Sequence, residues 1–364
     1  MKLTRRQFIR STNGVTLAVL AGNAFAQSPG PVTAFPLIDF HVHLFGIGDG
    51  GTGCWFSEKQ KQHLNFRYLL RLLELKPNGQ LDGDYVRRLV AQLKSSSIQK
   101  AVLQAWDCRY DEKGKPDWER TTSVFVPNDY MLQVVKRYPE FFIACASINP
   151  KRRDAIEELD RCAKQGAKVV KIHPPTMDVD PATPAFREFY RHCAANKIIV
   201  MVHTGAEHSA EIVGLENCDP QRLRLALAEG CTVIAAHGGL GAFFDREDFF
   251  PSLRALVRDF PDFYFDTAVL ASMFRWRNLP RILAEPELMA RAIHGSDFPF
   301  PSNALVSWNQ VAPSNLARLL PEKNLIERDY RLKRALGMPA EVFERGARLL
   351  QGASSPTPPR PTTP

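Results

Sequence analysis

The chain has 364 residues, of which 45% are hydrophobic and 24% are charged, an ordinary composition for a globular protein. No window approaches the roughly 20 consecutive apolar residues that a membrane-spanning helix needs. The formal net charge is +8, but no basic run is interleaved with aromatic residues, which argues against a nucleic-acid-binding protein.

The first 26 residues have the pattern of an export signal. Their positive charge comes from Lys2, Arg5, Arg6 and Arg10. No acidic residue occurs among them, and an apolar stretch at 15–20 is followed by the motif AFA, so we expect a secretory signal cleaved after Ala26. The stretch RRQFI resembles a twin-arginine signal, which predicts export in the folded state to the periplasm or cell exterior by the twin-arginine machinery. An uncleaved anchor is the alternative; after cleavage we expect no stable membrane insertion.

Seven cysteines occur without any CxxC pair, and their odd number leaves at least one unpaired within the chain. If folding precedes export it takes place in a reducing compartment, so neither a disulfide scaffold nor a cysteine zinc site is expected. The last residues, 351–364, form a Pro/Ser/Thr tail that cannot bury a core and is predicted to be disordered.

Short apolar runs recur along the rest of the chain and alternate with helical patterns. The runs are 36–43, 100–106, 141–148, 167–173, 197–203, 232–237, 263–268 and 291–297. Near-continuous apolar runs of this length are typical of parallel strands that are buried on both faces. Eight strand–helix repeats predict an α/β fold, a (β/α)₈ TIM barrel over 27–350, with long loops at 44–99 and 107–140 after the first two strands.

Polar residues gather where the predicted strands end. They are His41, His43, His173, His203, His237 and Asp297. The carboxyl ends of all barrel strands meet at one rim, so these side chains are expected to converge. Residues i and i+2 of a strand face the same side, which places His41 and His43 together inside the barrel, where two imidazoles can bind one cation.

Each histidine also has a purely structural interpretation, because a single strand histidine is more often a hydrogen-bonded core residue than a ligand. His294 lies three residues before Asp297 and is expected to pack against helices on the opposite face. His63 and His192 lie in helical patterns and are interpreted as surface or packing residues. His208, just past the fifth strand, could reach the rim.

Five segments together resemble the amidohydrolase superfamily, in the branch that includes aminocarboxymuconate-semialdehyde decarboxylase. They are DFHVH, GAKVVKIHPP, VHTG, AAHGG and HGSDFP, which span 39–299. The resemblance implies one divalent metal, commonly zinc, held by His41, His43, His203 and Asp297, with His237 as a catalytic residue.

The number of metals is open. Lys171 and His173 can both face inward, and binuclear members of the superfamily carry a carboxylated lysine at this strand, with counterparts of His203 and His237 on the second metal. Lys171 stops two residues short of the rim, so we favour one metal and a buried lysine that serves as an anion-binding or network cation. His173 would then be either a hydrogen-bonded rim residue or a substrate contact.

These residues predict a metal-dependent hydrolase of a C–N or C–O bond in a small molecule such as a lactone, ester or amide. Water activated by the metal would attack, Asp297 would accept its proton, and His237 would stabilise the oxyanion or protonate the leaving group. A nonoxidative decarboxylase of a small carboxylic acid and a non-catalytic small-molecule binder are the alternatives. The sequence is also compatible with a homo-oligomer.

Other residues are candidates for supporting roles. Asp39 is expected to orient a ligand histidine or to be held by backbone donors. Trp55, in the glycine-rich loop after the first strand, is a candidate lid or stacking group. Arg109 and Arg275 are candidates to bind a substrate carboxylate, or else solvated surface charges.

Overall fold

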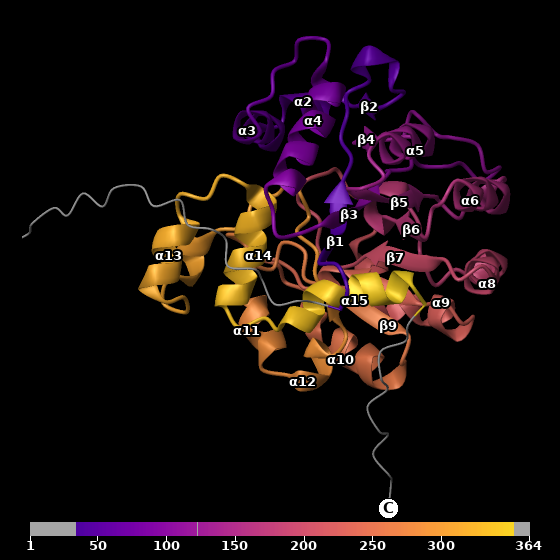
Figure 1. Cartoon of the computed structure of the whole chain (residues 1–364). Helices are drawn as coiled ribbons and strands as arrows, with labels where there is room; N and C mark the ends of the chain where they lie inside the picture. The colour runs from indigo at the N-terminus through magenta and orange to yellow at the C-terminus, as the bar shows by residue number, and fades with distance from the viewer. Residues whose placement is uncertain (1–33, 122, 353–364) are drawn as a thin grey trace, which may run out of the picture. The chain divides into compact units, whose positions relative to one another are not determined.

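The computed structural model describes residues 34–121 and 123–352, and Figure 1 shows their arrangement. The predicted signal at 1–26 and all but the first two residues of the predicted tail lie outside the described residues. Within the described part of the chain, no helix combines the length and apolarity required to cross a membrane.

Eight parallel strands form the centre of the structure and follow one another in chain order. They are β1 (Ile38–His43), β3 (Lys100–Gln104), β5 (Phe142–Ser147), β6 (Val169–Ile172), β7 (Ile199–His203), β8 (Val233–Ala236), β9 (Phe263–Asp266) and β10 (Ala292–Ile293). The amide of Phe40 donates to the carbonyl of His294 at 2.9 Å, and that of His43 to Phe298 at 3.0 Å, which joins the last strand region to the first. The predicted (β/α)₈ barrel is confirmed.

Helices cover the outside of this sheet (Figure 1). Those that follow the strands are α5 (Asn128–Arg137), α6 (Ala155–Lys164), α7 (Pro174–Met177), α8 (Arg187–Ala195), α9 (Arg224–Ala228), α10 (Phe250–Asp259), α11 (Asn278–Leu283), α12 (Pro286–Met289), α13 (Pro313–Leu319), α14 (Leu325–Ala335) and α15 (Ala340–Leu350). The long segment after β1 contains α2 (Glu58–Gln62), α3 (Leu64–Leu72) and α4 (Leu81–Lys94). Two short strands, β2 (Trp55–Phe56) and β4 (Val124–Phe125), pair antiparallel and tie the two predicted loops together.

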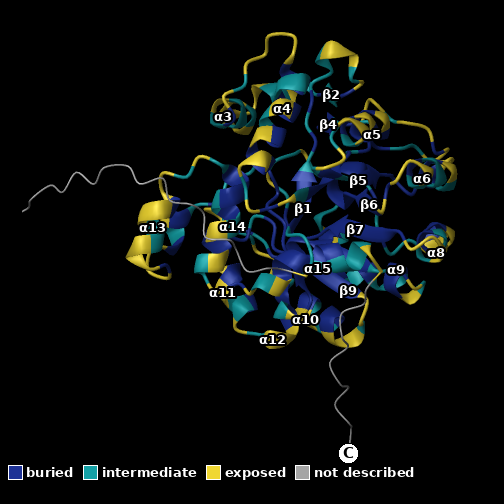
Figure 2. Cartoon of the chain, viewed as in Figure 1, coloured by how far each residue is buried: buried dark blue, intermediate teal, exposed yellow. Residues whose placement is uncertain are grey.

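Apolar side chains alternate along the strands between two clusters. In β7, Val200 and Val202 belong to the large cluster that packs against the helices, whereas Ile199 and Met201 belong to a smaller cluster inside the barrel. His203 continues the inward series, since successive strand side chains point to opposite faces. The strands are accordingly buried, while the helices expose their outer faces (Figure 2).

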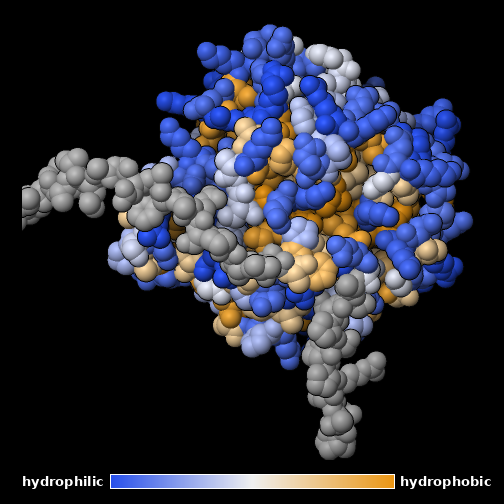
Figure 3. All heavy atoms as spheres, in the orientation of Figure 1, coloured by the Kyte–Doolittle hydropathy of each residue, from blue (hydrophilic) through white to orange (hydrophobic). Residues whose placement is uncertain are grey.

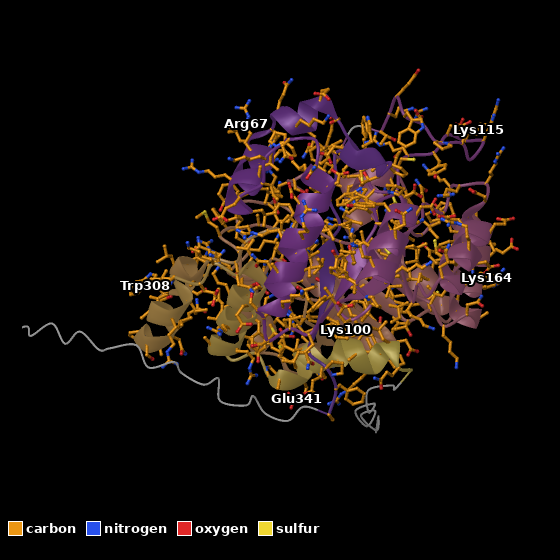
Figure 4. All side chains as sticks on the ribbon, turned by 45° about the horizontal axis from the view of Figure 1, so that its top comes forward. Arg67, Lys100, Lys115, Lys164, Trp308 and Glu341 are labelled. Atoms are coloured by element: carbon orange, nitrogen blue, oxygen red, sulfur yellow. The ribbon has the colours of Figure 1, made fainter. Side chains whose placement is uncertain are left out.

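Hydrophilic residues surround the face shown in Figure 3, and hydrophobic residues appear between them toward its centre. Lys115 and Lys164 lie at the outer edge of the molecule in Figure 4, as does Trp308, which is 67% exposed. All seven cysteines are buried and free in the structure.

Candidate active site

A cavity of about 660 Å³ lies at the carboxyl ends of the strands. Its lining includes His43, Trp106, His173, His203, Glu207, His208, His237, Arg275 and Asp297. Most of the predicted site residues thus share one cavity although they come from distant parts of the chain. Trp106 and Glu207, which line it too, were not predicted as site residues.

Three of the four predicted metal ligands converge on one point. The Nε2 atoms of His41 and His43 lie 3.2 Å apart, and Asp297 Oδ1 lies 3.1 Å from the first and 2.9 Å from the second. Neighbouring ligand atoms around a zinc ion are about 3.3 Å apart when the metal–ligand bonds are about 2.0 Å. The three atoms therefore have the spacing of ligands that share one cation.

The chemistry of this donor set fits a divalent metal. Asp297 Oδ1 is buried and has no hydrogen-bond partner of acceptable geometry, despite its closeness to both rings. Burial would raise the pKa of Asp297, but the adjacent His41 and His43 hold it well below its usual range. A buried, ionised and unpartnered oxygen beside two imidazoles is a ligand set that zinc and related ions prefer.

Asp266 at the end of β9 fixes the orientation of His41. Its Oδ2 lies 2.7 Å from His41 Nδ1, and both side chains are fully buried. Because a carboxylate only accepts hydrogen bonds, Nδ1 carries a proton, and in the neutral form of the ring, which is the form that can bind a metal, Nε2 keeps a free lone pair toward His43 and Asp297. Asp266 was missed from the sequence: it lies two residues before the end of the predicted strand 263–268, whereas Asp297 ends its predicted strand.

His237 lies directly after β8 and is held in a left-handed backbone conformation with φ 62°. Its amide donates to Asp266 Oδ1 at 2.8 Å, and its Nδ1 lies 3.3 Å from the carbonyl of Ala268. That carbonyl can only accept, so Nε2 is the acceptor atom of the ring. Burial lowers the pKa of His237 to about 3, which keeps the ring neutral at neutral pH.

His203 belongs to a different group of side chains. It lies with His173 and Glu207, and the ligand atoms of these three residues are within 4.8 Å of one another. Its Nε2 is buried without a hydrogen-bond partner. The three-residue group of His41, His43 and Asp297 does not include it, so the predicted four-ligand set is only partly assembled.

Glu207 and Trp106 determine how His173 is oriented. Glu207 Oε2 lies 3.5 Å from His173 Nε2, and Thr176 Oγ1 lies 2.9 Å from His173 Nδ1. The indole of Trp106 donates to the same Thr176 oxygen at 3.1 Å. Burial lowers the pKa of His173, so the ring is neutral with its proton on Nε2, facing the carboxylate.

Lys171 on β6 reaches the candidate metal centre from below. Its Nζ lies 3.4 Å from His41 Nε2, and the side chain is buried. Lys171 was expected to stop two residues short of the rim, and its long side chain reaches the centre from that position in β6. Burial lowers the pKa of Lys171, against the opposing effect of the nearby Asp266 and Asp297 carboxylates.

The other candidates have different positions. Arg275 lines the cavity, but its guanidinium donates to the carbonyls of Leu240, at 3.1 Å, and Ala206. Arg109 is buried outside the cavity lining, where its Nε donates to the carbonyl of Thr176 at 3.0 Å, so it is not a solvated surface charge. Trp55 is likewise absent from the lining and packs against Trp118, with ring centroids 6.3 Å apart.

The remaining polar candidates can also be placed. Asp39 accepts the amides of His41, at 3.1 Å, and Ser296, at 2.9 Å, which is the backbone-held alternative. His208 lines the cavity and pairs with Asp245 at 2.9 Å. His294 is buried against Phe343 of α15, as expected, with ring centroids 4.6 Å apart. His192 pairs with Asp160, and the exposed His63 caps α3.

Gly295 allows the last strand to approach His41 closely. A Cβ atom at this position would lie 2.8 Å from His41 Cβ and 3.4 Å from the Cβ atoms of Ala268 and Asp266. We expect Gly295→Ala to lower the free energy of unfolding by about 1–3 kcal/mol through overpacking, as measured by urea denaturation. Gly83→Ala is the control, because Gly83 lies within α4 and its nearest neighbour would be an arginine nitrogen at 3.4 Å. A loss no larger than in the control would contradict the expected clash.

Solved structures share this fold at low sequence identity. An uncharacterised TIM-barrel protein from Bordetella bronchiseptica matches 83% of this chain and 100% of its own, with 16% identity and a TM-score of 0.53. A Pseudomonas putida protein described as a candidate 2-pyrone-4,6-dicarboxylic acid hydrolase matches 88% of this chain and 99% of its own, with 17% identity and a TM-score of 0.51. The 5-carboxyvanillate decarboxylase of Sphingomonas paucimobilis matches 85% of this chain and 99% of its own, with 15% identity and a TM-score of 0.46.

No curated protein sequence matches the chain. A family model described as amidohydrolase matches residues 38–306. This range contains every strand of the barrel as well as His41, His43, His203, His237 and Asp297. This match covers most of the chain and agrees with the histidine- and aspartate-lined rim. The chain belongs to the amidohydrolase family.

Proposed function

We propose that the protein is a metal-dependent hydrolase that acts on a C–N or C–O bond of a small molecule such as a lactone, ester or amide. The observation that carries the proposal is the convergence of His41 Nε2, His43 Nε2 and Asp297 Oδ1 within 3.2 Å of one another at the base of a cavity. Zinc is the proposed metal, because imidazole and carboxylate ligands favour this ion. One ion is the proposed number, because the set of converging ligands is small.

The chain's own residues have defined roles in this proposal. His41, His43 and Asp297 would hold the metal, and His203, whose Nε2 lacks a partner, is the proposed fourth ligand. When bound, the metal would supply Lewis-acid polarisation and lower the pKa of water. Asp297 is the proposed proton acceptor. His237, neutral with a free Nε2, can receive a proton or a hydrogen bond from the reacting group and return the proton to the leaving group.

A nonoxidative decarboxylase is the second candidate, and it is favoured by the cations around the centre. Lys171 lies 3.4 Å from a ligand nitrogen and Arg275 lines the same cavity, an environment that attracts a substrate carboxylate. Turnover in ¹⁸O-labelled water separates the two: a hydrolase incorporates the label into its product, whereas a decarboxylase releases carbon dioxide.

Metal removal is expected to abolish turnover. Dialysis against dipicolinic acid should give an inactive protein that remains folded by circular dichroism, because the apolar clusters that pack the barrel contain none of the proposed ligands. Adding back one equivalent of zinc or manganese should restore activity in a screen of lactones, esters, amides and aromatic carboxylic acids. Full activity in protein shown to be free of metal would refute the proposed function.

The signal pattern supports a further proposal about location. We propose that the protein is exported folded by the twin-arginine route to the periplasm or cell exterior, with its metal already loaded.

A further inference from the structure

A second, smaller chamber opens beside the candidate metal centre. It has a volume of about 90 Å³ and shares six lining residues with the larger cavity: His43, Asn65, Leu69, Trp106, Ser209 and Phe300. The remaining wall is largely apolar and includes Phe45, Phe56, Phe66, Leu70, Leu73 and Val124. The chamber therefore continues the active-site space on the side of a proposed metal ligand.

The aromatic part of the wall is a packed cage. The ring of Phe56 lies 5.2 Å from that of Phe45 and 5.1 Å from that of Phe66, measured between centroids, and Phe45 and Phe66 are 5.9 Å apart. Rings at these separations support one another, so the chamber is a property of the packed loop region rather than of one side chain.

Two polar groups at the wall already have partners. The Tyr85 hydroxyl donates to the carbonyl of His43 at 2.6 Å, and the Gln60 amide donates to the carbonyl of Ser209. A charged group placed here would lose its hydration against a wall whose side chains are mostly hydrocarbon. The wall therefore accepts hydrocarbon.

We propose that the substrate carries an apolar arm of roughly three to five carbon atoms next to its reacting bond, and that this arm occupies the chamber beside His43. The proposal rests on the hydrolase or decarboxylase function proposed above. An apolar cavity of about 150 Å³ accommodates benzene, so a chamber of about 90 Å³ suits a short or branched alkyl group.

The larger cavity has more polar and charged lining residues than the chamber, and this difference predicts how the substrate is oriented. Arg275, Glu207, Ser302, Asn303 and Arg328 all line it, and none of them lines the chamber. The polar end of the substrate is therefore expected in the larger cavity, with the reacting bond between the two spaces at His43 and Asp297.

Three hydroxamic acids test the arm, because the hydroxamate group binds a divalent metal whatever its substituent. Acetohydroxamic acid has one carbon in its arm, pentanohydroxamic acid has four, and succinic monohydroxamic acid has an arm of similar length that ends in a carboxylate. Affinities for zinc-loaded protein are measured by isothermal titration calorimetry. Burial of each methylene strengthens binding by up to about fourfold, so pentanohydroxamic acid is expected to bind at least about tenfold tighter than acetohydroxamic acid. Succinic monohydroxamic acid should gain little.

Two variants of α3 locate the effect. Leu70→Trp narrows the chamber, whereas Leu64→Trp adds the same side chain at a position of the same helix that is 76% exposed and lines neither space. The gain of pentanohydroxamic acid over acetohydroxamic acid should disappear in Leu70→Trp and persist in Leu64→Trp. Leu305→Trp, which changes the larger cavity, should also preserve it.

The outcomes separate the two proposals. If acetohydroxamic acid binds only to metal-loaded protein but the longer arm gives no gain, or the gain survives Leu70→Trp, the apolar arm is wrong and the metal centre stands. If neither alkyl probe shows metal-dependent binding, the proposed function fails and the inference fails with it.

Discussion

Replacing Asp297 with asparagine is expected to abolish turnover and to weaken metal binding strongly, while the barrel remains folded. The substitution removes the negative charge that balances the cation and the proposed proton acceptor. General acid–base catalysis by one group contributes roughly 10²–10⁴-fold, so a fall in kcat of at least about a hundredfold is expected. Metal content of the purified variant and kcat on the substrate found in the screen measure the two effects.

The backbone at this position makes asparagine the informative replacement. Asp297 has φ 67°, a left-handed conformation that asparagine adopts more readily than most residues. A loss of activity would therefore report the missing carboxylate rather than a rearranged loop, and an unchanged urea midpoint would support this. Asp262→Asn is a matched control, because Asp262 is exposed and lies before β9, away from the cavity lining. A variant with normal metal content and full turnover would remove Asp297 from the proposed site.

The order of strands and helices in the barrel could be predicted, because each element has its own local sequence pattern. Each strand is indicated by an apolar run and each helix by apolar residues at helical spacing. The eight repeats can therefore be recognised without knowledge of any tertiary contact. The ends were less predictable. The last strand was expected to reach Asp297, but regular pairing covers only Ala292–Ile293, since Gly295 passes close to His41 and Asp297 turns into the left-handed region.

The site could be predicted where a residue lies at a strand end and not where it depends on a loop. Glu207 follows β7 within an irregular segment, and nothing in its spacing distinguishes it from a surface acid. Trp55 was expected near the substrate, but pairing of β2 with β4 directs it to Trp118, and Trp106 lines the cavity instead. Arg109 turns toward the carbonyl of Thr176, a contact that spans 67 residues and exists only in the folded chain.

The contact between Asp266 and His41 could not be predicted from the sequence either. Asp266 lies within the predicted strand 263–268, yet its partner His41 lies 225 residues away, and the two meet only because the barrel closes. Burial would raise the pKa of Asp266, but His41, His237 and Lys171 hold it below its usual range, so the group is an anion whose position is set by its neighbours. Its importance is therefore apparent from the contacts and not from the sequence pattern.

We expect Asp266→Asn to weaken metal binding by about 10–100-fold without removing any proposed ligand. Asp266 Oδ1 accepts the amides of His237, at 2.8 Å, and Ala268, at 3.1 Å, while Oδ2 faces His41 Nδ1. Asparagine has a single oxygen, and the two amides require it, so its NH₂ group must face His41. Two donors cannot pair, and His41 relieves the conflict by moving its proton to Nε2, the atom that points toward His43 and Asp297.

Two measurements distinguish this tautomer change from simple damage to the fold. Metal affinity is determined by competition with a chelator of known strength, and the protonated ring nitrogen of His41 is identified by ¹⁵N NMR of the metal-free protein. In the neutral ring of His41, wild-type protein should carry the proton on Nδ1 and Asp266→Asn should carry it on Nε2, so that zinc binds the variant only after the proton has returned to Nδ1. Because the two neutral tautomers hold the same number of protons, the loss of affinity should persist across the pH range in which the His41 ring is neutral. Wild-type affinity together with a retained Nδ1 proton would show that Asp266 does not control the ligand, since the hydrogen bond would then be replaceable without cost to the metal centre.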